Sequence, residues 1–201
     1  MVVPIDSSRI AIAVRADTAE FGFGPTRLNR NLWRSYDDGL ILPKSIYDAT
    51  LDLWKNPQQH SFYCTRATAF CVHAGIADAM GKEWTDKNGN RFFFLPEGDP
   101  AAMRRGLLEH TVQDTSTEWI TGDWGYIQNE ERAIGFESDI YAGENLIYLG
   151  GGKYWGHFAN DPFANNTLTL PEWEARVNEW GKSNTDKRRW CPKVGLSKEK
   201  K

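Results

Sequence analysis

Hydrophobic and polar positions follow different spacings along the chain, and the first half is mainly helical. Near the start, Ile10, Ile12 and Val14 alternate with other residues, which predicts a short strand followed by a glycine-containing loop. A helix of about ten residues is expected after Ser45, whose hydroxyl suits an N-cap, and Pro57 would end it.

The strongest helical pattern covers residues 64–80. Its apolar residues follow three- and four-residue spacing, and Gly81 lies where a glycine commonly terminates a helix. Further on, residues 87–90 predict a turn, residues 91–95 a buried strand and residues 100–110 another helix.

The second half of the chain is β-like. Two apolar runs, 145–149 and 153–158, are separated by Gly150-Gly151-Gly152, and this arrangement predicts a β-hairpin. A final helix is expected from Leu170 to about Trp180. Helices followed by a mainly antiparallel sheet indicate an α+β fold.

Length and composition fit one domain. The 201 residues are 40% hydrophobic and 25% charged, which allows a packed core. We expect a single domain over residues 1–201, with its core at about 29–182, a loose N-terminal segment and a basic C-terminal tail. Residues 187–189 and 198–201 supply the basic charge of this tail, and a solvated terminus explains it. The net charge of −3 gives no indication of a nucleic-acid partner.

Several function classes are disfavoured by what the sequence lacks. No run approaches the roughly 18 apolar residues of a membrane span, and the first residues do not resemble a signal peptide. The three cysteines, Cys64, Cys71 and Cys191, cannot all pair, which favours a reducing compartment such as the cytoplasm. There is no CxxC, and His73 and His110 have no ligand-like spacing, so neither a metal nor a cofactor is expected.

Cys64 is the candidate nucleophile. It follows an extended segment and opens the strongest predicted helix, where unpaired N–H groups and the positive end of the helix dipole favour the thiolate. The alternative is a buried cysteine that serves as a small apolar residue. Cys71, two turns further along the helix, has no terminus nearby and is expected in the core.

The predicted hairpin offers a base and an acid for such a nucleophile. Glu144 and His157 are 13 residues apart, and a two-residue loop at Gly150-Gly151 would place them directly opposite each other on one face. A four-residue loop keeps that register, whereas a three-residue loop would separate the pair onto two faces. A solvated Glu/His surface pair is the alternative.

Four stretches of the chain resemble the small bacterial transglutaminases of the spore-coat type, which are protein-glutamine gamma-glutamyltransferases with an NlpC/P60-like papain core. The likeness covers roughly residues 31–75 and 118–158. In chain order the stretches are Asn31-Leu32-Trp33-Arg34 with the helix at 46–54, Phe62-Tyr63-Cys64-Thr65-Arg66-Ala67-Thr68-Ala69, Gly122-Asp123 with Tyr126, and Gly143-Glu144-Asn145-Leu146-Ile147 through Tyr154-Trp155-Gly156-His157.

The resemblance implies a single catalytic domain in which a helix that begins with the nucleophile packs on an antiparallel sheet. It implies that Cys64 is the nucleophile, that Glu144 is its principal acid/base partner, and that His157 assists. The family can carry a second glutamate immediately before its cysteine, and here that position is Tyr63. The family's site is a tunnel that admits glutamine from one end and lysine from the other.

We expect three aromatic residues to contact the substrate, namely Trp155, Tyr63 and Trp124. Trp155 is predicted on the same hairpin face as His157, where it would help to exclude water. Without water, a thioester on Cys64 passes to a lysine amine and an isopeptide crosslink forms, whereas a wet site hydrolyses it.

Two other functions are compatible with the same residues. The first is a glutamine deamidase or peptidase that uses the same Cys/Glu/His site with water as acceptor. The second is a non-catalytic binding module, in which Cys64 would be unreactive. The partners implied are proteins that bear glutamine and lysine. If the chain is an effector or toxin domain delivered into a target cell, an inhibitory or immunity protein that blocks the site is also expected.

Overall fold

The computed structural model describes residues 5–35, 41–43, 45–88, 111–112, 118–129, 143–157, 166–178 and 183–190. The first part of the chain supplies most of the helices and four short strands. In chain order its elements are α1 (Ile5–Asp17), β1 (Gly22–Phe23), β2 (Trp33–Ser35), β3 (Ile41–Pro43), α2 (Ile46–Lys55), a 3-10 turn η1 (Pro57–Gln59), β4 (Ser61–Phe62) and α3 (Cys64–Asn88). The four strands form two pairs, β1 with β4 and β2 with β3.

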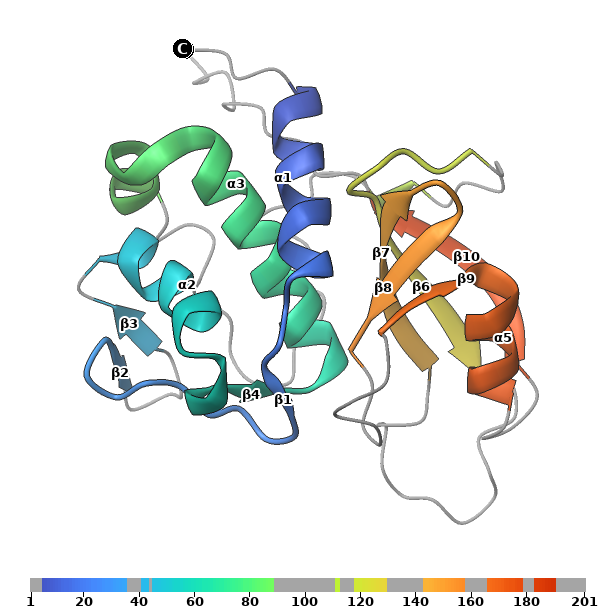
Figure 1. Ribbon diagram of the computed structural model, residues 1–201, viewed down its shortest axis with the longest axis horizontal. Coiled ribbons are helices and arrows are strands. Elements are labelled where there is room, and N and C mark those ends of the chain that lie inside the picture. The colour runs from blue at the N-terminus through green and yellow to red at the C-terminus, as the bar shows by residue number, and fades with distance from the viewer. Residues whose placement is uncertain are drawn as a thin grey trace.

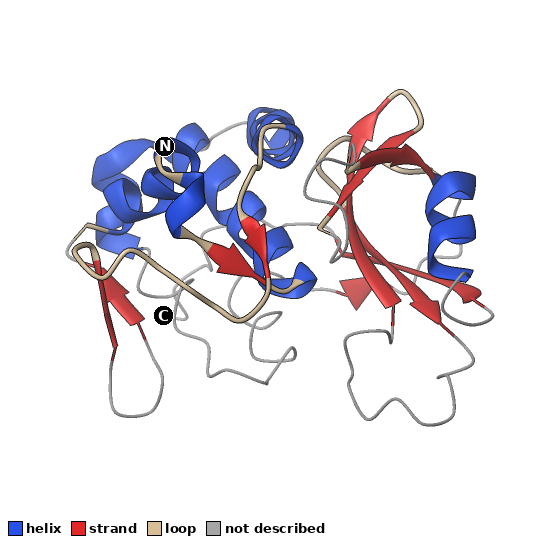
Figure 2. Cartoon of the chain, turned by 60° about the horizontal axis from the view of Figure 1, so that its bottom comes forward, coloured by secondary structure: helices blue, strands red, loops and turns tan. Residues whose placement is uncertain are grey.

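The second part supplies the main sheet and one helix, which are β5 (Thr111–Val112), β6 (Trp124–Asn129), β7 (Gly143–Gly150), β8 (Lys153–Gly156), β9 (Thr167–Thr169), α5 (Leu170–Asn178) and β10 (Ser183–Trp190). The six strands are antiparallel in the order β5-β10-β6-β7-β8-β9. Helices α1, α2 and α3 lie on one side of this sheet (Figure 1), and α5 covers its other face (Figure 2). The α+β architecture predicted from the sequence is confirmed.

The first segment corrects the sequence prediction, because residues 5–17 form helix α1 instead of a strand. Ile12 and Ala16 are fully buried against α3, whereas Ile10 and Val14 are 59% and 55% exposed. The apolar residues that suggested a strand therefore lie on two faces of the helix, Ile12 on the buried face and Ile10 and Val14 on the exposed face. Since α1 belongs to the core, the expected core boundary at residue 29 was also too late.

Gly75 allows α1 and α3 to cross at close range. A Cβ atom at this position would lie 2.4 Å from the backbone nitrogen of Ile12 and 2.5 Å from its Cα atom. Backbone atoms cannot rotate away as a side chain can, so any larger residue would force the two helices apart.

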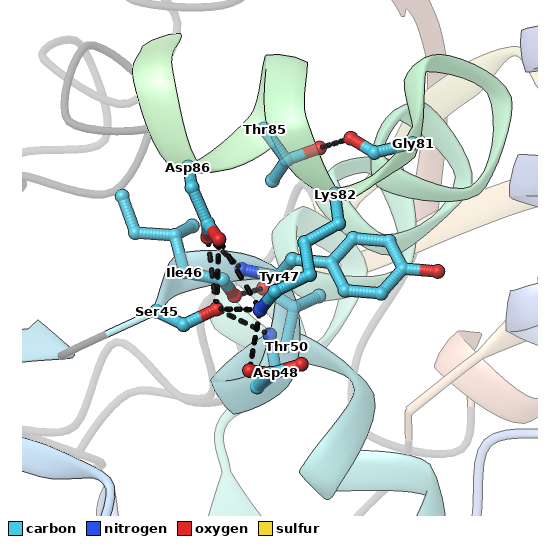
Figure 3. A network of polar contacts seen from close by, with 9 residues as sticks. All are labelled: Ser45, Ile46, Tyr47, Asp48, Thr50, Gly81, Lys82, Thr85 and Asp86. Atoms are coloured by element: carbon cyan, nitrogen blue, oxygen red, sulfur yellow. Dashed lines mark hydrogen bonds and ion pairs between the residues drawn. The ribbon is translucent and has the colours of Figure 1, made fainter.

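Helix α2 begins and ends where the sequence predicts. The Ser45 hydroxyl accepts a hydrogen bond from the Asp48 backbone N–H at 3.1 Å, as expected for an N-cap. Asp86 of α3 accepts from the Tyr47 N–H at 3.0 Å, and Lys82 pairs with both Asp48 and Asp86. This network ties the start of α2 to the end of α3 (Figure 3).

Gly81 interrupts α3 where the sequence placed the end of a helix. Its φ of 77° breaks the helical backbone, as predicted, but a second helical segment then continues to Asn88. The break turns this second segment, with Lys82 and Asp86, toward α2 (Figure 3).

The turn before β6 joins the helical layer to the sheet. A Cβ atom on Gly122, whose φ is +87°, would lie 2.5 Å from the Arg9 carbonyl oxygen of α1. The Arg9 guanidinium donates to the fully buried Asp123 carboxylate at 2.9 Å, and the Ile120 N–H donates to the same carboxylate. The Gly-Asp pair therefore fixes α1 against the sheet, beside β7.

The predicted hairpin and final helix are confirmed as β7–β8 and α5, in which Trp173 and Val177 are fully buried. The prediction of a solvated tail is wrong for residues 187–189, because residues 183–190 form β10, which lies between β5 and β6 within the sheet. The predicted basic residues 198–201 fall outside the described residues. Residues 119–121 precede the sheet as an irregular segment and a turn. The expectations for residues 89–110, Trp180 and Cys191 fall outside the described residues.

Candidate active site

Cys64 is the first residue of α3. The preceding strand β4 pairs with β1 through Gly22 and Ser61, so the backbone enters the helix from a fixed extended segment. The N–H groups of Arg66 and Ala67 donate to the Tyr63 carbonyl at 3.0 Å, which closes the first helical turn. The predicted position of Cys64 at a helix N-terminus is confirmed.

The polar side chain that contacts the sulfur comes from strand β7. Asn145 Nδ2 donates to Cys64 Sγ at 3.4 Å and to Thr65 Oγ1 at 3.1 Å. Its Oδ1 accepts from the Trp124 indole N–H at 2.9 Å. Asn145 and Trp124 are both buried, with 4% and 3% of their surfaces exposed.

Glu144 is buried beside this cluster, with 2% of its surface exposed. Its Oε1 accepts from the His157 backbone N–H at 3.2 Å. Burial raises the pKa of the Glu144 carboxyl well above its usual range, and the backbone N–H groups of His157 and Asn145 oppose this effect. The carboxylate is near enough to Cys64 to perturb its thiol electrostatically.

His157 is held by carbonyl oxygens and aromatic rings. Its Nε2 lies 3.2 Å from the Gly22 carbonyl, which can only accept, so Nε2 carries a proton. The ring stacks on Trp155 at 5.9 Å between centroids and also contacts Phe21 and Phe23. Burial lowers the pKa of His157 to about 4, so the imidazole is neutral at physiological pH.

The hairpin register differs by one from the prediction. Leu146 pairs with Gly156 and Ile147 with Trp155, and continuation of this ladder places His157 opposite Asn145. The cause is an irregularity between Tyr148 and Gly150, which adds a residue to β7 before the turn. The predicted direct pairing of Glu144 with His157 is therefore wrong, although the Glu144 carboxylate still reaches the His157 backbone.

The expectation that Cys64 rests as a thiolate is also corrected. Burial and, next, the negative charge of Glu144 raise the pKa of the thiol to about 12, while hydrogen bonds from Asn145 and Thr65 lower it. The helix N-terminus was expected to favour the thiolate, but loss of water and a nearby carboxylate outweigh that contribution. The resting site holds a neutral thiol.

The three expected substrate-contacting aromatic residues lie in different environments. Tyr63 is 39% exposed and packs edge-on against Phe23, at 5.4 Å between ring centroids. Trp155 is 1% exposed and lies behind His157, and Trp124 is 3% exposed and holds Asn145. Tyr63 alone of these three presents appreciable surface next to the cysteine.

Asn145 was missed at the sequence level because the predicted register assigned the shared face to Glu144. A signal was present, since the Gly150-Gly151-Gly152 turn also permits an odd loop or a bulge, and either would have moved Asn145 to the His157 face. Within the described residues, no cluster of three or more metal-ligating side chains occurs. None of the described helices is long and apolar enough to cross a membrane.

Comparison with known proteins places the chain in a family. The family model for protein-glutamine gamma-glutamyltransferase matches residues 7–167. The chain belongs to this family.

Two individual proteins are similar to the chain. The chain is 26% identical over 138 residues to the protein-glutamine gamma-glutamyltransferase of Bacillus pumilus, covering 67% of this chain and 52% of that protein. It therefore spans about half the length of that curated relative. A transglutaminase structure from Geobacillus stearothermophilus, without its C-terminal extension, superposes with a TM-score of 0.68 at 19% identity, over 94% of this chain and 86% of the other. At this identity the superposition shows the fold.

Proposed function

We propose that the chain catalyses isopeptide crosslinking of protein glutamine to lysine, on a papain-like core of the NlpC/P60 type. The observation that carries the proposal is the grouping of Cys64, at a helix N-terminus, with the buried Glu144 carboxyl and with His157, the residue that follows β8. Membership of the family supports the assignment of this chemistry.

In the first half of the reaction, Cys64 Sγ attacks the γ-carboxamide carbon of glutamine as the Glu144 carboxylate takes the thiol proton. The tetrahedral intermediate collapses when the C–N bond breaks, and the proton on Glu144 passes to the leaving nitrogen. Ammonia departs and a thioester remains.

In the second half, a lysine amine attacks the thioester carbon. The C–S bond breaks, the amine proton returns through Glu144 to the sulfur, and the isopeptide product leaves. A carboxyl group with a raised pKa suits both transfers, because it is a stronger base than an ordinary carboxylate and still donates readily. Neutral His157 orients the site through the Gly22 carbonyl instead of supplying a charge.

A neutral cysteine and a neutral histidine at rest fit a buried site. With His157 uncharged and Cys64 protonated, no thiolate–imidazolium pair is needed before substrate arrives. The proton moves when the carboxamide reaches the sulfur. Exposed Tyr63, next to Cys64, is the proposed contact for the incoming side chain. Trp155 stacks on His157 and the Trp124 indole binds Asn145, so both add buried aromatic surface near the site.

The test combines the protein with a glutamine peptide and a primary amine and follows the peptide by mass spectrometry. Transfer gives the amine adduct, Cys64→Ala abolishes it, and the matched control Cys71→Ala, which changes the fully buried cysteine of the same helix, retains it. A gain of one mass unit without adduct would show a deamidase instead. No modification of the peptide by the folded wild-type protein would overturn both functions.

The proposed partners are proteins that present glutamine and lysine side chains. The proposal extends to two settings, the cytoplasm of the producing cell and a target cell that receives the chain as an effector. In the second setting an immunity protein would have to cover Tyr63 and Cys64. Co-expression with neighbouring genes, followed by the amine-transfer assay, separates the settings, because a cognate inhibitor would suppress adduct formation.

A further inference from the structure

Asn145 occupies a position at the reacting atom that the sequence did not reveal. Within the part of the chain that the structure describes, the side-chain hydrogen bonds to Cys64 Sγ come from Asn145, at 3.4 Å, and at the longer distance of 4.0 Å from Thr65. Glu144 and His157 make no direct hydrogen bond to the sulfur among these residues. The nearer of the two side-chain groups at the sulfur is therefore a neutral amide.

The orientation of this amide is fixed by its partners. An indole N–H can only donate, so Trp124 requires the carbonyl end of Asn145 to face it. The NH2 end then faces the sulfur and Thr65 Oγ1, and each of its two protons has an acceptor. A flipped amide would put two donors together at Trp124 and an oxygen lone pair against the sulfur. Trp124 thus decides which end of Asn145 meets Cys64.

We propose, building on the transferase function above, that Asn145 is a further catalytic residue whose side-chain N–H stabilises negative charge on Cys64 Sγ, and that Trp124 is its positioning residue. No bond to Asn145 forms or breaks. As the thiol loses its proton to Glu144, the N–H···S contact becomes a charge-assisted hydrogen bond and strengthens. The same contact stabilises the sulfur again when the C–S bond of the thioester breaks.

Such a contact accelerates the chemistry because it is stronger in the charged state than in the resting thiol. A neutral hydrogen-bond donor at the sulfur is particularly useful here, since the charge of Glu144 opposes thiolate formation. Burial of Asn145 and Trp124 keeps water from replacing the amide.

The experiment compares the rate of Cys64 alkylation by iodoacetamide across pH 6–11 with the rate of amine transfer. Asn145→Leu keeps the approximate size and removes the donor. We expect its alkylation profile to shift to higher pH, with a rate at pH 8 lowered roughly tenfold per unit of pKa shift, and kcat/KM for transfer lowered roughly 100-fold. Unchanged alkylation and unchanged transfer in a folded Asn145→Leu protein would overturn the proposal.

A pair of tryptophan variants tests the proposal if Asn145→Leu does not fold. Trp124→Phe removes the N–H that orients the amide, and Trp54→Phe is the matched control, because its indole N–H donates to the Arg15 carbonyl away from the site. The proposal expects Trp124→Phe to shift the alkylation profile in the same direction as Asn145→Leu and Trp54→Phe to leave it unchanged. Equal profiles for the two variants would contradict it.

The two readouts separate this proposal from the transferase assignment. If the wild-type protein forms no amine adduct, the transferase function fails, but the alkylation comparison still measures the effect of Asn145 on the sulfur. A shifted profile would then support the role of Asn145, and an unshifted one would overturn it.

Discussion

The Glu144 carboxylate is bound to the backbone of His157, through an N–H···O contact of 3.2 Å, and not to its imidazole ring. This contact ties the acid to the end of β8, while the ring itself is turned toward the Gly22 carbonyl of β1. The carboxylate and the imidazole therefore contact different parts of the site. The charge of Glu144 raises the pKa of the Cys64 thiol, and the His157 ring packs among Trp155, Phe21 and Phe23.

Replacement of Glu144 by glutamine separates reactivity of the sulfur from turnover. Glu144→Gln removes the negative charge that raises the pKa of Cys64, so the thiolate fraction at pH 8 should increase and iodoacetamide should label Cys64 faster than in the wild type. Amine transfer should nevertheless be lost, because no group remains to carry the proton. Mass spectrometry of labelled Cys64 and the adduct assay measure the two effects. Retained transfer would remove Glu144 from the mechanism.

Tyr63 allows the missing second acid to be restored. In this family a glutamate can precede the cysteine. The corresponding residue here, Tyr63, is exposed, so its position has room for a glutamate. We expect Tyr63→Glu to return measurable amine transfer to Glu144→Gln, since a carboxylate would again lie one residue from the nucleophile. Tyr63→Gln in the same background is the control and should remain inactive. Equal activity of the two double variants would show that the carboxylate is irrelevant.

The pH profile of transfer reports the charge state of His157. Because burial lowers the pKa of His157 to about 4, no inflection due to this residue should appear between pH 6 and 8 in kcat/KM. His157→Gln should lower the rate by disturbing the contact to Gly22 without removing a limb of the profile in that range. An inflection near pH 6.5 that disappears in His157→Gln would show that the histidine titrates during catalysis.

The sequence predicted the position of Cys64 in the fold better than the register of the hairpin. Cys64 could be placed because an extended segment, a cysteine and a helical pattern are consecutive, and the helix indeed begins at that residue. The register of β7–β8 could not be predicted, because it depends on how the turn at Gly150 absorbs one residue of β7. One residue of slip exchanges the two faces of a strand, so Asn145 took the position assigned to Glu144.

The errors in the fold have a similar origin. Ile10 and Val14 are apolar yet exposed, so the α1 pattern imitates the alternation of a strand. Strand β10 carries Lys187, Arg188 and Arg189, and its place in the sheet is determined by pairing with β6, more than fifty positions earlier in the chain. Local composition describes neither kind of contact, because both depend on residues distant in the sequence.

Gly75 is predicted to be a stability determinant of the helical layer. Gly75→Ala should lower the free energy of unfolding by about 1–3 kcal/mol, because the added methyl group meets the Ile12 backbone and α1 must move away from α3. Urea denaturation measures the change. Glu83→Ala, at an exposed position of the same helix, is the control and should have an effect within about 0.5 kcal/mol. A neutral or stabilising Gly75→Ala would contradict the close crossing of the helices.

His73 should make the folded state sensitive to acid. Burial lowers its pKa to about 3, so the folded protein keeps it neutral while the unfolded chain binds a proton below about pH 6.5. The stability it confers is therefore complete above pH 6.5 and is lost as the pH falls toward 3, with a slope of up to about 1.4 kcal/mol per pH unit. His73→Leu should flatten the dependence of the unfolding free energy on pH between 4 and 6. Cys71→Ala is the control, because it changes a neighbouring core residue that does not titrate in that range. It should lower the stability and leave the slope unchanged. An equal slope in wild type and His73→Leu would exclude His73 as the source of the pH dependence.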